Sequence, residues 1–234
     1  MSANLLENQA PTVKAAVAYI HHKISRSDGG ISAFSQEFIN RYRKANSQGG
    51  YTLKPVHYFR RQRINQQGAG TFDLIEPQNS AMKGVSNIDN ARLPEGEDII
   101  VVKQRLAFAT SATFAAPNAP TEAELDPALQ TYSSLTEDMP GDGTENCLVM
   151  YQQNDTTINT YQVPELIVPE LERGDNGFQH VHPLFHLRGG SDIKVMFQGH
   201  KNFKLVDPVN TGNITATHFI SFAFLGFTLK PEAN

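Results

Sequence analysis

Four of the eight histidines in the chain lie close together, in the stretch GFQHVHPLFHLRGGSDIKVMFQGH from residue 177 to residue 200. They are His180, His182, His186 and His200. A metal site needs imidazole nitrogens that converge on one point, about 2.0–2.1 Å from the ion. Because residues i and i+2 share one face of a strand, His180 and His182 could both reach one metal ion. These histidines are therefore the first candidates for chemistry.

The His-x-His pair resembles the first motif of the cupins, which are metal-binding barrels related to jelly rolls. That motif implies a glutamate four or five residues after the second histidine, where this chain has His186 and a leucine. It also implies a later histidine in a Pro-Gly frame, and neither His200 nor His218 has one. A metal site at His180, His182 and His186 is therefore the less favoured interpretation, and we predict no cofactor.

The same stretch is explained more simply by two strands and a turn. Proline cannot donate to a strand ladder, so we expect the first strand to start near Pro183 and His180 to lie in a loop. The Arg-Gly-Gly-Ser sequence at 188–191 is typical of a tight turn. The next strand should point three alternating apolar side chains inward: Ile193, Val195 and Phe197.

Other catalytic motifs are not found in the sequence. It contains no Gly-x-Ser-x-Gly and no glycine-rich phosphate loop, and its single cysteine, Cys147, cannot form an intrachain disulfide. Asp73, Glu76 and Asp192 fit solvated strand ends better than an acid–base pair. We therefore predict that the protein is not an enzyme and is made in a reducing compartment.

The first fifty residues are predicted to form a helical arm. Apolar residues recur at three- and four-residue spacing from Pro11 to Ile24, which favours a helix that begins at the proline. After SRSDGG, a second helix is expected from Ile31 until Gly49-Gly50 ends it. Neither helix has a wide apolar stripe, so we expect the arm at 1–50 to dock on something else.

Residues 51–234 are predicted to form an all-β body. About eight strand-like runs occur without the regular alternation with helices that a parallel sheet requires. The closing run THFISFAFLGFTLK is apolar on both faces, and Asn154-Asp155 is a good hairpin connection. We expect a jelly-roll barrel or sandwich with a long acidic loop at about 115–146. GEDIIVV and GSDIKVM echo each other, so two small tandem barrels remain the alternative to one barrel.

Charge is distributed unevenly along the chain. Residues 1–63 carry ten basic and three acidic residues, a net charge of +7, whereas residues 64–234 carry ten basic and twenty-one acidic residues, a net charge of −11. Clustered cations with aromatic neighbours can contact the phosphates of nucleic acid or of lipid headgroups, although they can also simply face solvent. The residues predicted to contact an anionic partner are Arg41, Arg43, Lys44, Arg60, Arg61 and Arg63.

Three stretches resemble strands of jelly-roll capsid proteins from icosahedral, membrane-containing bacteriophages of the adenovirus-type lineage, whose barrels stand upright in the shell. They are LPEGEDIIVVKQRLAFA, LVMYQQNDTTINTYQVPEL and THFISFAFLGFTLK. The resemblance implies a structural virion protein, made in the host cytoplasm, that self-assembles as a homo-oligomer, commonly a trimer, with other virion proteins. It also implies that the basic arm faces the inner membrane or the genome.

Two alternatives to the capsid interpretation remain open from sequence. One is the cupin-like metal-binding barrel enzyme; the other is a carbohydrate- or receptor-binding jelly roll, in which Tyr132, Tyr151 or Tyr161 could stack on sugars. The N-terminus has no charged and apolar pattern of a secretory signal. No apolar run approaches the roughly 20 residues needed to cross a bilayer. We therefore expect a soluble or assembly-bound protein.

Overall fold

The computed structural model describes residues 11–25, 38–40, 42–43, 52–64, 67–75, 81–88, 92–93, 97–111, 114–115, 126–135, 139–167, 177–205, 214–215 and 217–230. Its long strands are β1 (Thr52–Arg63), β2 (Thr71–Ile75), β3 (Ile99–Thr110), β5 (Leu148–Gln153), β6 (Thr156–Gln162), β7 (Gln179–Leu187), β8 (Ile193–Gln198) and β10 (His218–Lys230). Two short strands, β4 (Phe114–Ala115) and β9 (Ile214–Thr215), and the helix α2 (Pro11–Ser25) accompany them. Short 3-10 helices are η1 (Pro127–Leu129), η3 (Thr144–Asn146) and η4 (Val163–Leu166).

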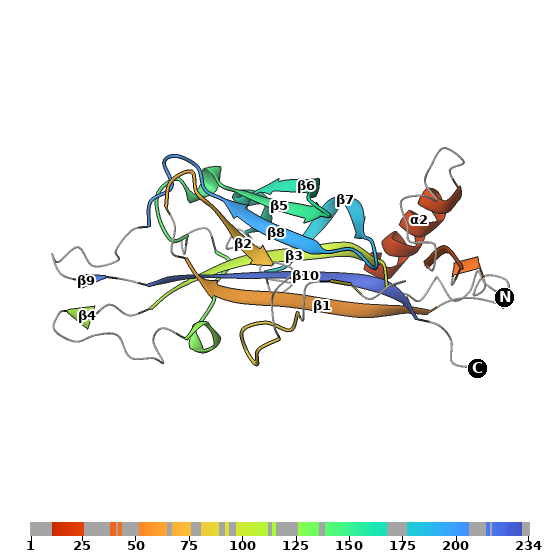
Figure 1. Cartoon of the computed structure of the whole chain (residues 1–234), viewed down its shortest axis with the longest axis horizontal. Coiled ribbons are helices and arrows are strands. Elements are labelled where there is room, and N and C mark those ends of the chain that lie inside the picture. Colours follow the sequence, from red (N-terminus) through yellow and green to blue (C-terminus); the bar gives the residue numbers. More distant parts are fainter. Residues whose placement is uncertain are drawn as a thin grey trace.

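The eight long strands form two four-stranded antiparallel sheets that face each other (Figure 1). One sheet has the order β1-β10-β3-β7 and the other has the order β2-β8-β5-β6. The short strands β4 and β9 pair with each other and prolong the β3–β10 ladder, since the Ser111 amide donates to the Thr217 carbonyl between the two pairs (2.9 Å). The all-β prediction is confirmed as a two-sheet sandwich.

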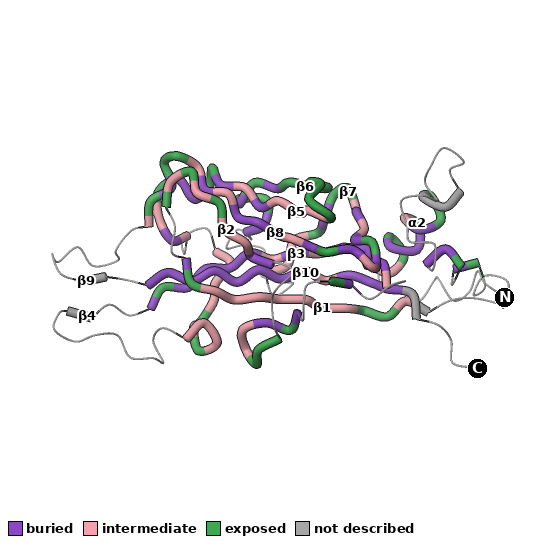
Figure 2. Tube along the Cα trace, in the orientation of Figure 1, coloured by how far each residue is buried: buried purple, intermediate pink, exposed green. Residues whose placement is uncertain are grey.

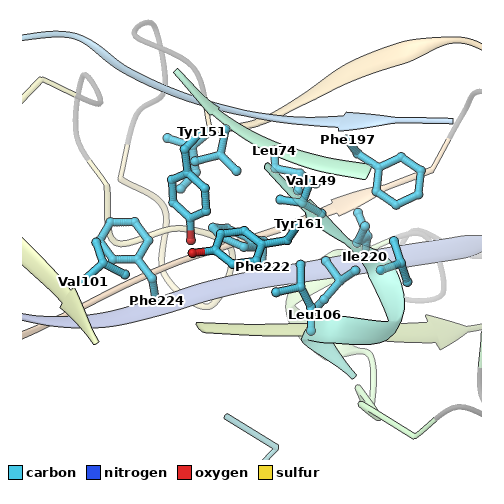
Figure 3. Packing of buried hydrophobic residues seen from close by; sticks show 14 of the residues in the cluster. Leu74, Val101, Leu106, Val149, Tyr151, Tyr161, Phe197, Ile220, Phe222 and Phe224 are labelled. Atoms are coloured by element: carbon cyan, nitrogen blue, oxygen red, sulfur yellow. The ribbon is translucent and has the colours of Figure 1, made fainter. Parts of the chain in front are cut away.

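One hydrophobic core fills the space between the two sheets (Figure 3). Its members include Ile193, Val195 and Phe197 of β8, so the predicted alternation of that strand is confirmed. GEDIIVV contributes to β3 and GSDIKVM to β8, which lie in opposite sheets around this same core. The alternative of two tandem barrels is therefore wrong, because the two echoing segments build one sandwich.

Strand β10 lies in the middle of its sheet and is buried on both faces (Figure 2). Ile220, Phe222 and Phe224 enter the core between the sheets. Phe219 and Ala223 point to the other face and are also fully buried. The prediction of a strand covered on both sides is confirmed, and something must therefore cover the outer face of this sheet.

At one end, the N-terminal helices cover that outer face. Ala16 and Ile20 of α2 pack with Phe38, Ile39 and Tyr42 in a second hydrophobic cluster. Its sheet-side members are Ile100 and Val102 of β3 and Phe227 of β10. The first predicted helix is confirmed, and residues 38–40 and 42–43 are helical as expected. The rest of the second predicted helix lies outside the described residues.

Further along the sheet, two connecting segments cover the outer face. Residues 81–88 run beside β1, where the Arg61 amide donates to the Val85 carbonyl (2.7 Å). The segment 126–135 belongs to the predicted acidic loop, and its Ser133 exchanges backbone hydrogen bonds with Phe108 of β3. It contains η1, whose first turn is capped by the Asp126 carboxylate. Since this segment contacts both β1 and β3, it crosses β10, which lies between them.

Strand β7 begins earlier than the sequence indicates. It starts at Gln179, and His180 pairs with Lys103 of β3, so the prediction that His180 lies in a loop is wrong. The strand tolerates Pro183 because β7 is an edge strand and its ladder to β3 is interrupted there. The register jumps from the Val101–Phe185 pair to the Lys103–His180 pair, so the proline removes no hydrogen bond of the ladder.

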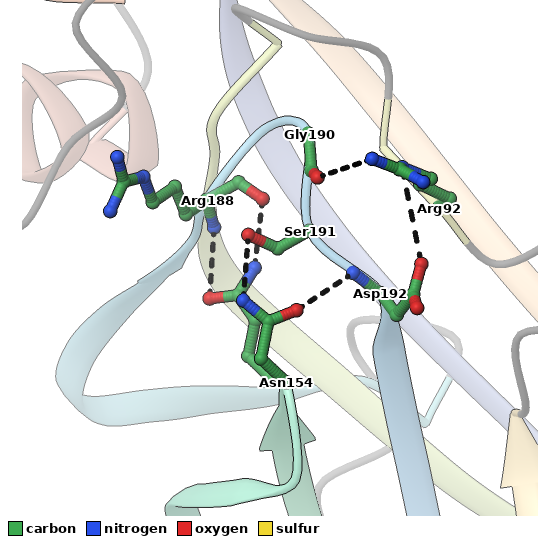
Figure 4. Close-up of polar contacts among 7 residues, drawn as sticks. Arg92, Asn154, Arg188, Gly190, Ser191 and Asp192 are labelled. Carbon is green, nitrogen blue, oxygen red and sulfur yellow. Dashed lines mark hydrogen bonds and ion pairs between the residues drawn. The ribbon is translucent and has the colours of Figure 1, made fainter.

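The predicted hairpin at Asn154-Asp155 joins β5 to β6, and both residues have left-handed backbone angles (φ 49° and 59°). Figure 4 shows how its tip is tied to the turn between β7 and β8. The Gln153 amide side chain donates to the Arg188 carbonyl (2.8 Å) and accepts from the Arg188 amide (3.1 Å). Asn154 makes longer hydrogen bonds to Ser191 and Asp192. This network ties the β5–β6 hairpin to the turn that leads from β7 in one sheet to β8 in the other.

Strand β6 stops at Gln162, although the apolar pattern continues to residue 168. Pro164 follows two residues later and cannot donate to a ladder, so the chain turns into η4. The carboxylate of Glu165 accepts from the Gln162 amide (2.6 Å), and Val163 and Leu166 are buried. The apolar residues after β6 thus pack into the core but do not extend the sheet.

Candidate functional site: the outer face of the β1-β10-β3-β7 sheet

The predicted histidine cluster does not converge in the structure. His180 and His182 are exposed on β7, on the side opposite to the buried Val181, and their ring centroids lie 6.4 Å apart. His186 is hydrogen-bonded through Nδ1 to the Tyr19 hydroxyl (3.0 Å), and His200 contacts Asn202 and Cys147. Across the described part of the chain, no group of three or more His, Cys, Asp or Glu residues is arranged to hold a metal.

The described members of the predicted basic set lie in two separate places. Arg43 is exposed in the helical segment near α2, while Arg41 and Lys44 lie outside the described residues. Arg60, Arg61 and Arg63 lie at the far end of β1 from Leu53, which packs against the helices. With a rise of about 3.3 Å per residue, roughly 25 Å of strand separate the two groups. Arg43 and the three arginines of β1 therefore do not form one continuous patch.

Within the β1 group, the three arginines have different surroundings. Arg60 and Arg61 are half-buried on opposite faces, since Arg60 is the partner of core residue Phe222 and Arg61 is the partner of Ser221. Arg63 is exposed. Arg61 faces the outer side, under the segment 126–135. Its surroundings are described in detail by the contacts of its guanidinium group.

Aromatic rings hold the Arg61 guanidinium. Its Cζ atom lies 5.0 Å from the ring centroid of Tyr132 and 5.6 Å from that of Phe59. Its Nη1 donates to the Gly84 carbonyl (3.1 Å). The Tyr132 hydroxyl in turn donates to the Pro127 carbonyl (3.0 Å), and burial is the main cause of its raised pKa. Both distances lie within the range of cation–π attraction.

A second arginine, Arg105 of β3, lies nearby on the same face. The register aligns Arg105 with Ala223 of β10 and, across it, with Phe59 of β1. Its Cζ atom lies 5.1 Å from the ring centroid of Phe178. Burial lowers the pKa of Arg105, and the positive charge of Arg61 lowers it further. Sequence inspection missed Arg105, although its outward position follows from the alternation of apolar residues in KQRLAFA.

Small side chains form the floor between the two arginines. Ser221 and Ala223 of β10 and Ala107 of β3 all point to the outer face and are buried. The Ser221 hydroxyl, which belongs to a residue only 1% exposed, has no hydrogen-bond partner among the described residues. The Nε atom of Arg61 is also buried without a partner there. Arg61 and Ser221 are direct partners in the pairing of β1 with β10.

His57 completes this cluster on β1. Its ring lies 5.7 Å from Phe59 and 5.9 Å from Phe178, measured between centroids. Burial lowers the pKa of His57, and the positive charge of Arg105 adds to this effect. The cluster thus combines three basic side chains with three aromatic rings, an arrangement that favours a negatively charged ligand over a cation.

Two of the three tyrosines that could stack on sugars in the carbohydrate-binding alternative lie in the core. Tyr151 is completely buried in the core, and Tyr161 is 7% exposed. Tyr132 is half-buried, with its ring against Arg61. The prediction of Tyr151 and Tyr161 as sugar platforms is therefore wrong, because both rings pack between the two sheets.

No family model matches this chain, and no curated protein matches it. Among the described residues, no helix has the length and apolar character needed to cross a membrane.

Proposed function

We propose that this chain is a structural, self-assembling capsid subunit with a jelly-roll body. The observation that carries the proposal is the nested pairing of its eight long strands. The innermost pair is β5–β6, followed outward along the chain by β3–β7, β2–β8 and β1–β10. These four pairs are those of one long hairpin whose tip is Asn154-Asp155. The hairpin is rolled up, so that β10 also pairs with β3 and β8 also pairs with β5. This nesting supports a jelly roll, a double Greek key that is also used by viral capsid domains.

Jelly rolls also serve as metalloenzymes and lectins, so the fold alone does not select a function. A cupin-like enzyme needs room between its sheets for an ion and a substrate, and here that space is filled by Tyr151, Phe222 and Phe224 (Figure 3). A sugar-binding role is supported less well, because two of the three tyrosines proposed for it are buried in the core. A structural role, in which the outer surfaces of the chain contact other copies of it, is supported best.

The proposal assigns the partners by charge and position. Copies of the chain associate, commonly as trimers, and tile into a shell together with other virion proteins. The N-terminal region, with its net charge of +7, faces the interior and meets the anionic headgroups of an inner membrane or the genome. The protein is made in the host cytoplasm and resides in the virion. Assembly of this kind requires large repeated interfaces and no catalytic residue.

The test is the mass of the purified full chain, measured by light scattering across a concentration series, with negative-stain images of the same fractions. We expect trimers that grow into sheets or closed shells as concentration rises. A particle that stays monomeric at every concentration, with no ordered assemblies in the images, contradicts the proposal. Metal analysis of that monomeric fraction then tests the remaining enzyme interpretation.

A further inference from the structure

We propose that the outer edge of β6 is a latent pairing surface for β6 of a second copy of the chain, and that the side chains of Asn159 and Glu165 block it. The inference stands apart from the capsid proposal, because it concerns a contact that the single chain suppresses. It rests on the position of β6 in its sheet, on its composition and on two hydrogen bonds to its backbone.

Strand β6 ends the β2-β8-β5-β6 sheet, and no described residue pairs with its outer edge. The N–H and C=O groups on such an edge can take up a strand from another chain. The edges of the other sheet are protected by different means. Along β1 runs the segment 81–88, in which the Asn87 side chain bonds the Phe59 amide (2.8 Å) and the His57 carbonyl (2.6 Å). Strand β7 contains Pro183, which cannot donate to a ladder.

The composition of β6 favours pairing with a copy of itself. Thr156–Gln162 reads TTINTYQ, with four β-branched residues, one aromatic residue, no charge and no proline. Segments of six or seven residues with high β-propensity, low charge and no proline are the ones that stack most readily on identical segments. Because a two-fold axis lets both copies use the same edge, antiparallel pairing of β6 with β6 satisfies both chains at once.

The register identifies the backbone donors on the outer edge. In an antiparallel ladder, pairs that exchange backbone hydrogen bonds alternate with pairs that do not. The Val163 amide donates to the Cys147 carbonyl (3.0 Å), so the next pair along, which includes Gln162, is one that does not exchange hydrogen bonds. The same holds for Thr160, since the bulge in this ladder lies beyond Tyr151, towards the hairpin tip. The N–H groups of these two β6 residues therefore point to the free edge.

Two side chains of the same chain occupy these donors. Asn159 Oδ1 accepts from the Thr160 amide (2.9 Å), and the Glu165 carboxylate accepts from the Gln162 amide (2.6 Å). Asn159 is also oriented by its Nδ2 atom, which donates to the Tyr161 hydroxyl (2.7 Å). Local bonds from side chains to the backbone compete with a sheet ladder. A second β6 has to displace both side chains before it can pair, so they weaken that pairing.

The experiment compares the wild type with the double variant Asn159→Ala and Glu165→Ala by amide hydrogen exchange over a series of protein concentrations. In the double variant, we expect the Thr160 and Gln162 amides to become protected as concentration rises. The wild type should need a concentration roughly tenfold higher or more, since both competing acceptors are still present. Contacts between sheet faces leave these edge amides unpaired, so the measurement separates edge pairing from the assembly of a shell.

Gln152→Ala is the matched control, because it removes another exposed side-chain hydrogen bond of the β5–β6 hairpin and leaves the edge donors as they are. Since Glu165 also caps η4, Asn159→Ala alone is the second variant if the double variant does not fold. It should gain concentration-dependent protection at Thr160. If exchange at the edge amides stays independent of concentration in the folded variants, the proposal is overturned, because the unblocked edge then does not pair. Equal protection in Gln152→Ala also overturns it, because pairing then does not depend on the two blocking side chains.

Discussion

At the scale of single residues, the most consequential polar contact lies inside the core. Tyr151 is fully buried, and its hydroxyl donates to the Oε1 atom of Gln104, which is itself 1% exposed (2.9 Å). Burial holds the pKa of Tyr151 well above its ordinary value, so the phenol stays protonated and remains a donor. Rings of Phe185, Phe222 and Phe224 surround it at edge-to-face angles. This one hydrogen bond therefore gives both polar side chains a partner inside an apolar core.

Replacing Tyr151 by phenylalanine removes that donor and leaves Gln104 Oε1 with one fewer partner. We expect the free energy of unfolding to fall by about 1–3 kcal/mol, the usual cost of depriving a buried polar group of its hydrogen bond. Chemical denaturation measures the change. Adding Gln104→Leu should restore part of the loss, since both polar groups are then gone. A double variant less stable than the sum of the single changes would contradict the assigned contact.

At the scale of elements, close approach of segments decides which glycines can be replaced. Gly143 precedes η3 with a left-handed backbone (φ 78°), and a Cβ atom there would lie 2.6 Å from the Asn202 carbonyl oxygen. Gly68 has nearly the same backbone angle (φ 70°), but a Cβ atom there meets nothing within 4 Å. Both positions have a left-handed backbone, which disfavours any residue other than glycine. They differ in how close neighbouring atoms come to an added Cβ atom.

Gly68→Ala and Gly143→Ala therefore form a matched pair. We expect Gly68→Ala to cost about 1 kcal/mol of stability, because alanine pays only for the left-handed conformation. Gly143→Ala should cost clearly more, since the turn before η3 must also move away from residue 202. Denaturant midpoints of the two variants give the comparison. Equal midpoints would mean that the contact between these two segments is loose.

At the scale of the whole molecule, exposed apolar side chains indicate where copies could meet. The large hydrophobic residues exposed among the described ones are Met82, Leu129 and Ile158, with exposed fractions of 61%, 66% and 37%. Met82 and Leu129 lie on the two segments that cover the outer face of the β1-β10-β3-β7 sheet. These segments touch each other, since a Cβ atom at Gly84 would lie 2.9 Å from that of Ala128. Ile158 lies on β6 in the other sheet.

If copies of the chain associate through that covered face, the double variant Met82→Ser and Leu129→Ser should weaken assembly. We expect the assembly threshold concentration to rise several-fold with little change in Tm, because both side chains are exposed in the single chain. Light scattering measures the threshold. Ile158→Ser is the control and should leave it unchanged. An unchanged threshold in the double variant would place the interfaces elsewhere.

The sequence by itself determined the local features of this protein. The period-two alternation of 193–197, the apolar run of β10, the first helix from Pro11 and the left-handed turn at Asn154-Asp155 all depend on neighbours within a few residues. Such patterns express side-chain alternation and backbone preference, which act locally. Where a local rule was wrong, as at Pro183, the reason was the position of β7 at the edge of its sheet.

Only the tertiary structure decided which distant residues meet. The pairing of β1 with β10 and of β10 with β3 places Arg61, Ser221 and Arg105 on neighbouring strands. These strands lie far apart in the chain. Likewise, the burial of Tyr151 and Tyr161 follows from how the sheets stack, and the separation of Arg43 from Arg63 follows from where the helical segment packs on the sheet. A shift of register by one residue would turn Arg61 to the opposite face, so no local pattern can specify this site. Long-range pairing has to form before these side chains become neighbours.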